Sequence, residues 1–158
     1  MARTVGIGIQ SFEEIRINNY FYIDKTSFIK EWWESGDSVT LITRPRRFGK
    51  TMNMNMLESF FSVEYAERKD LFEGLSIWQE ESYRKLQGTY PVISLSFANI
   101  KEANYETARE KICEVLRNLY IKFSFLKKSD VLEEADRNYF SQVLEMEMKD
   151  SVATSAIH

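Results

Sequence analysis

The chain has 158 residues, of which 44% are hydrophobic and 28% are charged, and its net charge is −3. These values are typical of one globular domain and exclude a strongly basic, general nucleic-acid-binding protein. A single cysteine, Cys113, excludes an intramolecular disulfide. Because there is also no secretory leader and no apolar run of membrane-spanning length, we expect a cytoplasmic protein without a membrane span.

The upstream segment, residues 1–36, is predicted to hold a short helix that begins at Phe12, then a strand and a second helix. The apolar run 20–23 has the residue types of a strand. Asp24 follows it and precedes a helical pattern over 25–35, so we expect its carboxylate to cap that helix. Four apolar residues followed by an acid also fit a Walker B strand, whose carboxylate orders Mg²⁺. The helix that follows directly favours the cap.

The stretch Val39–Phe61 has the order strand, basic loop, Gly-Lys-Thr, helix, which is the context that a phosphate-binding P-loop requires. The first N–H groups of a helix lack intrahelical partners and lie at the positive end of the helix dipole, so they attract anions. Gly49 lets the backbone approach a phosphate, Lys50 can reach the β and γ phosphates, and the Thr51 hydroxyl is placed to bind Mg²⁺. The predicted nucleotide site consists of Arg44, Pro45, Arg46, Arg47, Phe48, Gly49, Lys50 and Thr51.

One position departs from the usual P-loop pattern, which is Gly, four residues, then Gly-Lys-Ser/Thr. Arg44 occupies the first glycine position, and an arginine cannot adopt a positive φ cheaply. Pro45 fixes its own φ and biases Arg44 toward an extended conformation, which predicts a stiff start to the loop. The alternative is a basic turn between a strand and a helix, without a phosphate-binding role.

The remainder of the chain is predicted to add a second strand and two longer helices. Residues 92–97 form an apolar run typical of a strand. Asn104 is predicted to be the N-cap of a helix over 105–124, whose apolar stripe we expect in a core or interface. A more polar helix is predicted over 130–148. Together with the strand at 39–43, these elements predict an α/β fold in which helices flank an incomplete parallel sheet.

Several motifs resemble those of the bacterial AAA-ATPase-like proteins, in which a P-loop ATPase domain is commonly followed by a PD-(D/E)XK nuclease-like domain. The stretches that carry the resemblance are Ile7–Phe12, Asn19–Thr26, Val39–Thr51, Asn53, Met56-Leu57, Leu71–Leu75 and Pro91–Phe97. In that family the form Arg-Pro-Arg-Arg-Phe-Gly-Lys-Thr, without the first glycine, is the usual one. The resemblance implies that 1–158 is the N-terminal part of one AAA/ASCE-like three-layer P-loop domain. It comprises the upstream segment 1–36 and a P-loop core over 37–158 that ends before the Walker B strand.

The resemblance also implies ATP and Mg²⁺ as ligands and a hydrolase as the full-length protein. Because the Walker B carboxylates and a residue to orient water are missing from the chain, we expect nucleotide binding with little or no hydrolysis by this chain alone. The sequence does not choose between ATP and GTP. The nuclease-like domain or nucleic acid would be a partner in the full-length protein, and a homo-oligomer is expected only by analogy with AAA-like relatives.

Two other hypotheses stay open. In the first, the basic loop 44–50 contacts nucleic acid or another partner directly, and such binding would be weak and sensitive to salt. In the second, the chain is an inactive truncated remnant, because an incomplete sheet leaves unpaired edges. The role of Asp24-Lys25-Thr26 is also open, and one hypothesis is that 20–26 packs near the base or ribose of the nucleotide.

Overall fold

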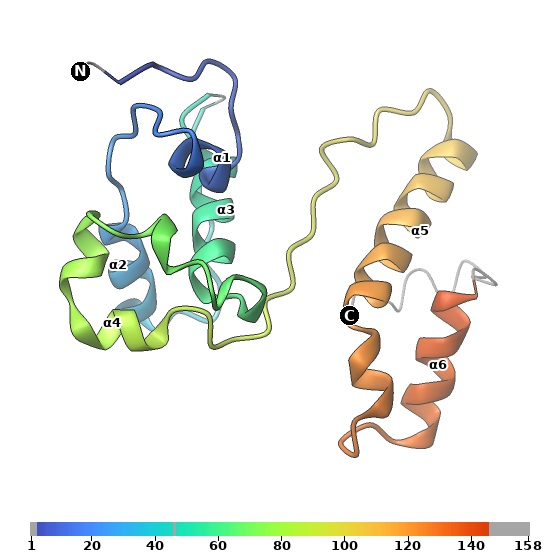
Figure 1. Cartoon of the computed structure of the whole chain (residues 1–158). Coiled ribbons are helices and arrows are strands. Elements are labelled where there is room, and N and C mark those ends of the chain that lie inside the picture. Colours follow the sequence, from blue (N-terminus) through green and yellow to red (C-terminus); the bar gives the residue numbers. More distant parts are fainter. Residues whose placement is uncertain (1–2, 46, 146–158) are drawn as a thin grey trace. The chain divides into compact units, whose positions relative to one another are not determined.

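The computed structural model describes residues 3–45 and 47–145, and the chain divides into two compact units, Met1–Val92 and Ile93–His158. Figure 1 shows the helices of each unit. The first unit contains α1 (Phe12–Ile17), α2 (Ser27–Ser35), α3 (Lys50–Phe61), η1 (Val63–Tyr65), η2 (Lys69–Leu71), η3 (Ser76–Gln79) and α4 (Glu81–Leu86), where η marks a 3₁₀ helix. The second unit contains α5 (Tyr105–Lys122), η4 (Ser124–Lys128) and α6 (Glu134–Leu144).

The predicted α/β fold, with its incomplete parallel sheet, is wrong. Within 3–45 and 47–145 the chain is helical, and its strand-like pairing is limited to one isolated parallel bridge between Ser62 and Tyr90. The segments 20–23, 39–43 and 92–97 lie outside helices and strands. A strand needs neighbours that pair its N–H and C=O groups and cover its apolar face. In the segment before α3 no such cover is present among the described residues, since the Val39 and Leu41 side chains are 86% and 81% exposed.

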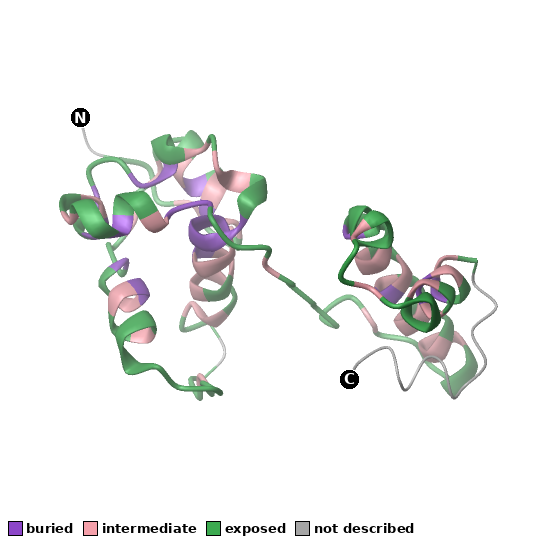
Figure 2. Cartoon of the chain, turned by 90° about the horizontal axis from the view of Figure 1, so that it is seen from below, coloured by how far each residue is buried: buried purple, intermediate pink, exposed green. Residues whose placement is uncertain are grey.

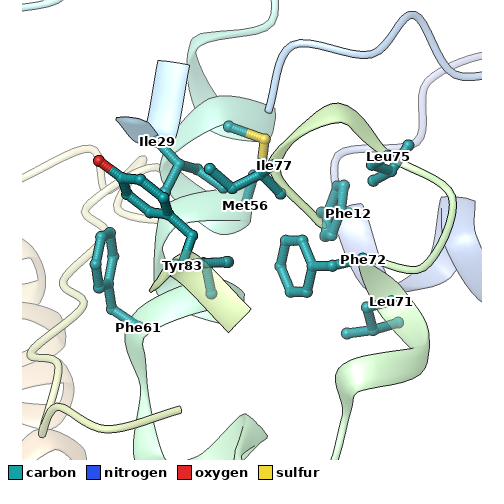
Figure 3. Packing of buried hydrophobic residues seen from close by; sticks show 10 residues of the cluster. Phe12, Ile29, Met56, Phe61, Leu71, Phe72, Leu75, Ile77 and Tyr83 are labelled. Carbon is teal, nitrogen blue, oxygen red and sulfur yellow. The ribbon is translucent and has the colours of Figure 1, made fainter. Parts of the chain in front are cut away.

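The core of the first unit is built around the second half of α3. Phe60 is fully buried, and its ring meets that of Phe72 edge-on with the centroids 5.1 Å apart. The Phe12 ring of α1 stacks on the Phe72 ring, and their centroids are also 5.1 Å apart. Figure 3 shows the Phe12 and Phe72 rings side by side. The buried face of α3 is therefore part of this core. The buried members of the cluster are Phe12, Ile29, Met56, Phe60, Phe61, Leu71, Phe72, Leu75, Ile77 and Tyr83.

Polar contacts hold α1 against α3 and η2. The Phe12 N–H donates to Asn55 Oδ1 at 2.7 Å, which satisfies one of the N-terminal donors of α1 with a side chain of α3. At the other end of α1, the Arg16 guanidinium donates to the carbonyl oxygens of Leu71 at 2.6 Å and Glu73 at 2.7 Å. Because both partners of Arg16 are backbone groups, these bonds fix the path of the chain after α3.

Asp24 does not cap α2, which begins at Ser27, so the predicted cap is wrong. Its carboxylate instead accepts three hydrogen bonds, from the N–H of Thr26 at 2.9 Å, the hydroxyl of Thr26 at 2.7 Å and the N–H of Ser76 at 2.7 Å. Thr26 is fully buried, and its hydroxyl oxygen also accepts from the N–H of Ile77 at 3.2 Å. The carboxylate therefore joins the turn before α2 to η3, a contact between segments distant in sequence.

These bonds also change the acidity of the carboxyl group. Partial burial alone would raise the pKa of Asp24, but the hydrogen bonds from Thr26 and Ser76 outweigh it and hold the pKa below its ordinary value. A lowered pKa in the folded chain means that the charged form stabilises the fold. That contribution is complete above the pKa of the unfolded chain and is lost as the pH falls through the pKa of the folded chain.

The second unit has its own small core between α5 and α6. Leu116 of α5 and Val143 of α6 are buried and belong to the same hydrophobic cluster. The predicted N-cap of α5 is confirmed, because the Asn104 side chain accepts from a backbone N–H of the first turn at 2.9 Å. Helix α6 begins at Glu134, later than expected for 130–148, and the far end of that prediction lies outside the described residues. Across the described ranges, none of the helices combines the length and hydropathy needed to cross a bilayer.

Replacing Gly88 by alanine tests the packing after α4. Gly88 has a φ of +70°, and a Cβ there would lie 2.4 Å from the Ala66 Cα, a backbone atom that cannot rotate away. We expect Gly88→Ala to lower the free energy of unfolding by about 3 kcal/mol or more. In Gly36→Ala the φ is similar, +65°, but nothing lies within 4 Å. That variant should lose only about 1 kcal/mol in urea denaturation, and equal losses in the two variants would contradict the packing described here.

The Asp24 carboxylate can be tested in the same way. Asp24→Ala leaves a fully buried hydroxyl and two N–H groups without their acceptor, and should cost about 2 kcal/mol of unfolding free energy at neutral pH. Asp37→Ala, at an exposed position just after α2, is the matched control and should change little. Because Asp24 has a lowered pKa, the difference between wild type and Asp24→Ala should shrink as the pH is lowered below about 4. If the difference in unfolding free energy between wild type and Asp24→Ala stays constant from neutral to strongly acidic pH, the charged Asp24 carboxylate does not stabilise the fold.

Candidate functional site

The basic loop lies at the exposed N-terminal end of α3, while the buried aromatic residues lie at the other end of this helix. In Figure 2 the segment between α2 and α3 is mostly green, the colour of exposed residues. Arg46 lies outside the described residues. Of the other predicted site residues, those that are exposed are Arg44, Pro45, Arg47, Phe48 and Thr51, and those that are half-buried are Gly49 and Lys50.

Two described residues of the loop have a left-handed backbone. Gly49 is the N-cap of α3 with a φ of +77°, a conformation that glycine adopts without steric cost. Arg47 has a φ of +69°, which costs a residue with a Cβ about 1–2 kcal/mol. At Arg44, the missing glycine position, the sequence predicted an extended conformation, and Arg44 indeed has no positive φ. The strained residue is therefore three positions later, directly before the turn into α3.

The Lys50 side chain folds back over the loop that precedes it. Its ammonium group donates to the carbonyl oxygen of Arg44 and, at 3.0 Å, to that of Pro45. These two bonds bring the start of the loop next to the first residue of α3. The structure therefore brings the backbone of Arg44 and Pro45 together with the ammonium group of Lys50.

The first turn of α3 offers the donors of an anion site. The first backbone bond of the helix runs from the N–H of Asn53 to the carbonyl of Gly49 at 2.9 Å. The N–H groups of Lys50, Thr51 and Met52 precede that bond and therefore have no acceptor within the helix. The helix dipole makes this end positive, and the cationic side chains of the loop add to it. Chemically, the arrangement suits a phosphate group.

One neighbour of the loop comes from the turn before α2. The ammonium nitrogen of Lys25 lies 3.7 Å from the position that a Cβ would take on Gly49. The sequence showed the Asp-Lys-Thr motif but not this contact, because nothing in the local pattern relates the turn to the loop. Tyr22, three residues before Lys25, packs against the core instead. Its hydroxyl lies 3.3 Å from Met56 Sδ, and burial raises the pKa of Tyr22 to about 12.

Comparison with known proteins identifies the family. The sequence description of a family named "Predicted AAA-ATPase" matches residues 6–155. The chain is also 34% identical over 111 residues to a protein of Azotobacter chroococcum mcd 1 described as an "uncharacterized protein in vnfD 5'region", an alignment that spans 70% of this chain but only 20% of that relative. No solved structure matches the chain significantly. Since the family match extends over nearly all of the sequence, including the basic loop and the Asp-Lys-Thr turn, the chain belongs to the predicted AAA-ATPase family.

Proposed function

We propose that this chain binds ATP as its magnesium complex, with the phosphates held by Arg44–Thr51 at the N-terminal end of α3. The observation that carries the proposal is the position of Lys50. Its ammonium group lies over the loop, bonded to two loop carbonyls, at a helix end whose first N–H groups have no acceptor within the helix. Family membership supports the proposal, because the family is described as that of a predicted AAA-ATPase.

Binding of a phosphate requires Lys50 to exchange partners. Its two bonds to the carbonyls of Arg44 and Pro45 are replaced by bonds to phosphate oxygens, which carry a full negative charge and accept more strongly. The N–H groups of the first turn of α3 then donate to the same phosphate. The arginine side chains of the loop can add forked bonds to further phosphate oxygens.

At this site Mg²⁺ would be bound mainly by the phosphates of the nucleotide and by water, with few protein ligands. Mg²⁺ in phosphate sites usually keeps several waters and takes one or two protein oxygens besides the phosphates. Thr51, the second residue of α3, is exposed at the same helix end as the loop, so its hydroxyl is the group assigned to the ion. Within the described residues, no cluster of three or more His, Cys, Asp or Glu side chains forms a separate metal site.

The proposed activity is binding, with little or no hydrolysis by this chain alone. Phosphoryl transfer also needs a group that orients the attacking water, and no residue of the chain is assigned to that task. The aligned region makes up only 20% of the relative from Azotobacter, so that protein is several times longer than the region it shares with this chain. In a full-length protein of this kind, we propose that the bound nucleotide would control a partner or a nuclease-like domain.

Titration calorimetry with Mg-ATP tests the proposal on the wild-type chain and Lys50→Ala. Loss of the Lys50 ammonium removes a charge-assisted contact, so binding should weaken by about tenfold or more. Lys85→Ala removes the same charge from α4, where the side chain is 76% exposed and pairs with Glu81, and should bind as the wild type does. ATP at about 100 times its Kd should also stabilise the fold by about 2.7 kcal/mol in a thermal shift. GTP and ADP serve as parallel ligands.

Two results would overturn the proposal. One is binding that does not depend on Mg²⁺, is equal for Lys50→Ala and falls steeply with salt, as expected for a nonspecific contact of the basic loop with polyanions. The other is the lack of any binding by a chain that unfolds cooperatively. A broad, non-cooperative unfolding transition would instead support the inactive remnant.

A further inference from the structure

The Asp24-Lys25-Thr26 turn is held rigidly on both sides of its lysine. The Asp24 carboxylate accepts from the N–H and hydroxyl of Thr26 and from the N–H of Ser76, at 2.7 to 2.9 Å. Thr26 is fully buried and also bonds to the N–H of Ile77. The backbone of Lys25 therefore cannot move without breaking this network, and the start of its side chain has a fixed position relative to η3.

From that fixed position, the Lys25 side chain reaches the phosphate loop. Its ammonium nitrogen lies 3.7 Å from the place of a Cβ on Gly49, the residue that turns the loop into α3. Among the described residues it has no hydrogen-bond or ion-pair partner, although Lys30 in the neighbouring helix pairs with Glu80 at 2.8 Å. A lysine held at one loop by a hydrogen-bonded turn, without a carboxylate partner, points to an anion that comes from outside the chain.

The charges around Gly49 support the same conclusion. Arg44, Arg47 and Lys50 also form no ion pair within the part of the chain that the structure describes. Cationic groups near one another repel, and a bound anion would relieve that repulsion. A single carboxylate would neutralise one of these cations, whereas the triphosphate tail of a nucleotide carries several negative charges in a row.

We infer that Lys25 is a second phosphate-binding ammonium, which the Asp24-Lys25-Thr26 turn adds to the loop beside Gly49. This inference rests on the proposed function, since it concerns the same nucleotide site. It assigns the turn to the phosphates of the ligand, whereas the hypothesis from the sequence placed the segment near the base or ribose. The two assignments differ in what they predict for a ligand that has neither base nor ribose.

Titrations with Mg-ATP and with inorganic tripolyphosphate plus Mg²⁺ test the inference on wild type, Lys25→Ala, Lys25→Arg and Lys85→Ala. We expect Lys25→Ala to weaken binding of both ligands by a similar factor, about tenfold. Lys25→Arg, which keeps the charge, should recover most of the affinity, and Lys85→Ala should bind as the wild type does. Because Lys25 is exposed, the thermal unfolding of its variants should match that of the wild type.

The outcomes separate this inference from the proposed function. If Lys50→Ala loses binding but Lys25→Ala binds like Lys85→Ala, the nucleotide site stands and the role of Lys25 is refuted. If Lys25→Ala weakens ATP but not tripolyphosphate, the lysine contacts the base or ribose and the phosphate assignment is refuted. If the wild type binds neither ligand, or Lys50→Ala binds as well as wild type, the proposed function fails and the inference fails with it.

Discussion

The burial of the second half of α3 among aromatic rings is the constraint on which the first unit depends. Phe60 meets Phe72 edge-on, and Phe12 of α1 stacks on Phe72. Fully burying such side chains is worth about 2–3 kcal/mol each, so one end of α3 is held firmly in the core. The opposite end of the same helix, which begins at Lys50, is left at the surface with its donors and its basic loop. Packing at one end of a rigid helix thus positions the candidate site at the other.

A second constraint is the hydrogen bonding that joins the turn before α2 to η3. The Asp24 carboxylate bonds to Thr26 and to the N–H of Ser76, so the turn before α2 and the segment η3 hold each other in place. Lys25 lies inside that turn and extends to Gly49. A residue that joins two segments of the fold and a residue that lies beside the basic loop are therefore neighbours in sequence.

The helices could be predicted from the sequence, because their signals are local. The apolar spacing of α3, the Asn104 cap of α5 and the glycine that ends α2 each act within a few residues. The strands could not be predicted in this way. Apolar runs such as 39–43 and 92–97 indicate a preference, but a sheet also needs partners that no local pattern supplies. The described residues provide none, and the α/β prediction was wrong for that reason.

At the candidate site, too, the local features could be predicted from the sequence and the features that depend on tertiary packing could not. The helix that was predicted to follow Gly-Lys-Thr is present and begins at Lys50, while the role of the basic loop as a nucleotide site stays a prediction. The positive φ of Arg47 and the approach of Lys25 to Gly49 did not follow, because both depend on how the turn, the loop and η3 pack together. For Asp24, the local cap pattern competed with tertiary donors from Thr26 and Ser76, and the tertiary donors determined its role.

The central claim is that nucleotide phosphates bind between the N-terminal end of α3 and the turn before α2. A titration of the isotopically labelled chain with Mg-ATP, followed by the NMR shifts of backbone amides, tests it most directly. The account predicts the largest shift changes at 47–52 and 24–26, saturating together, with α5 and α6 unchanged. Saturating changes that lie in α5 and α6, or that spread evenly over the surface and leave 47–52 unaffected, would contradict it.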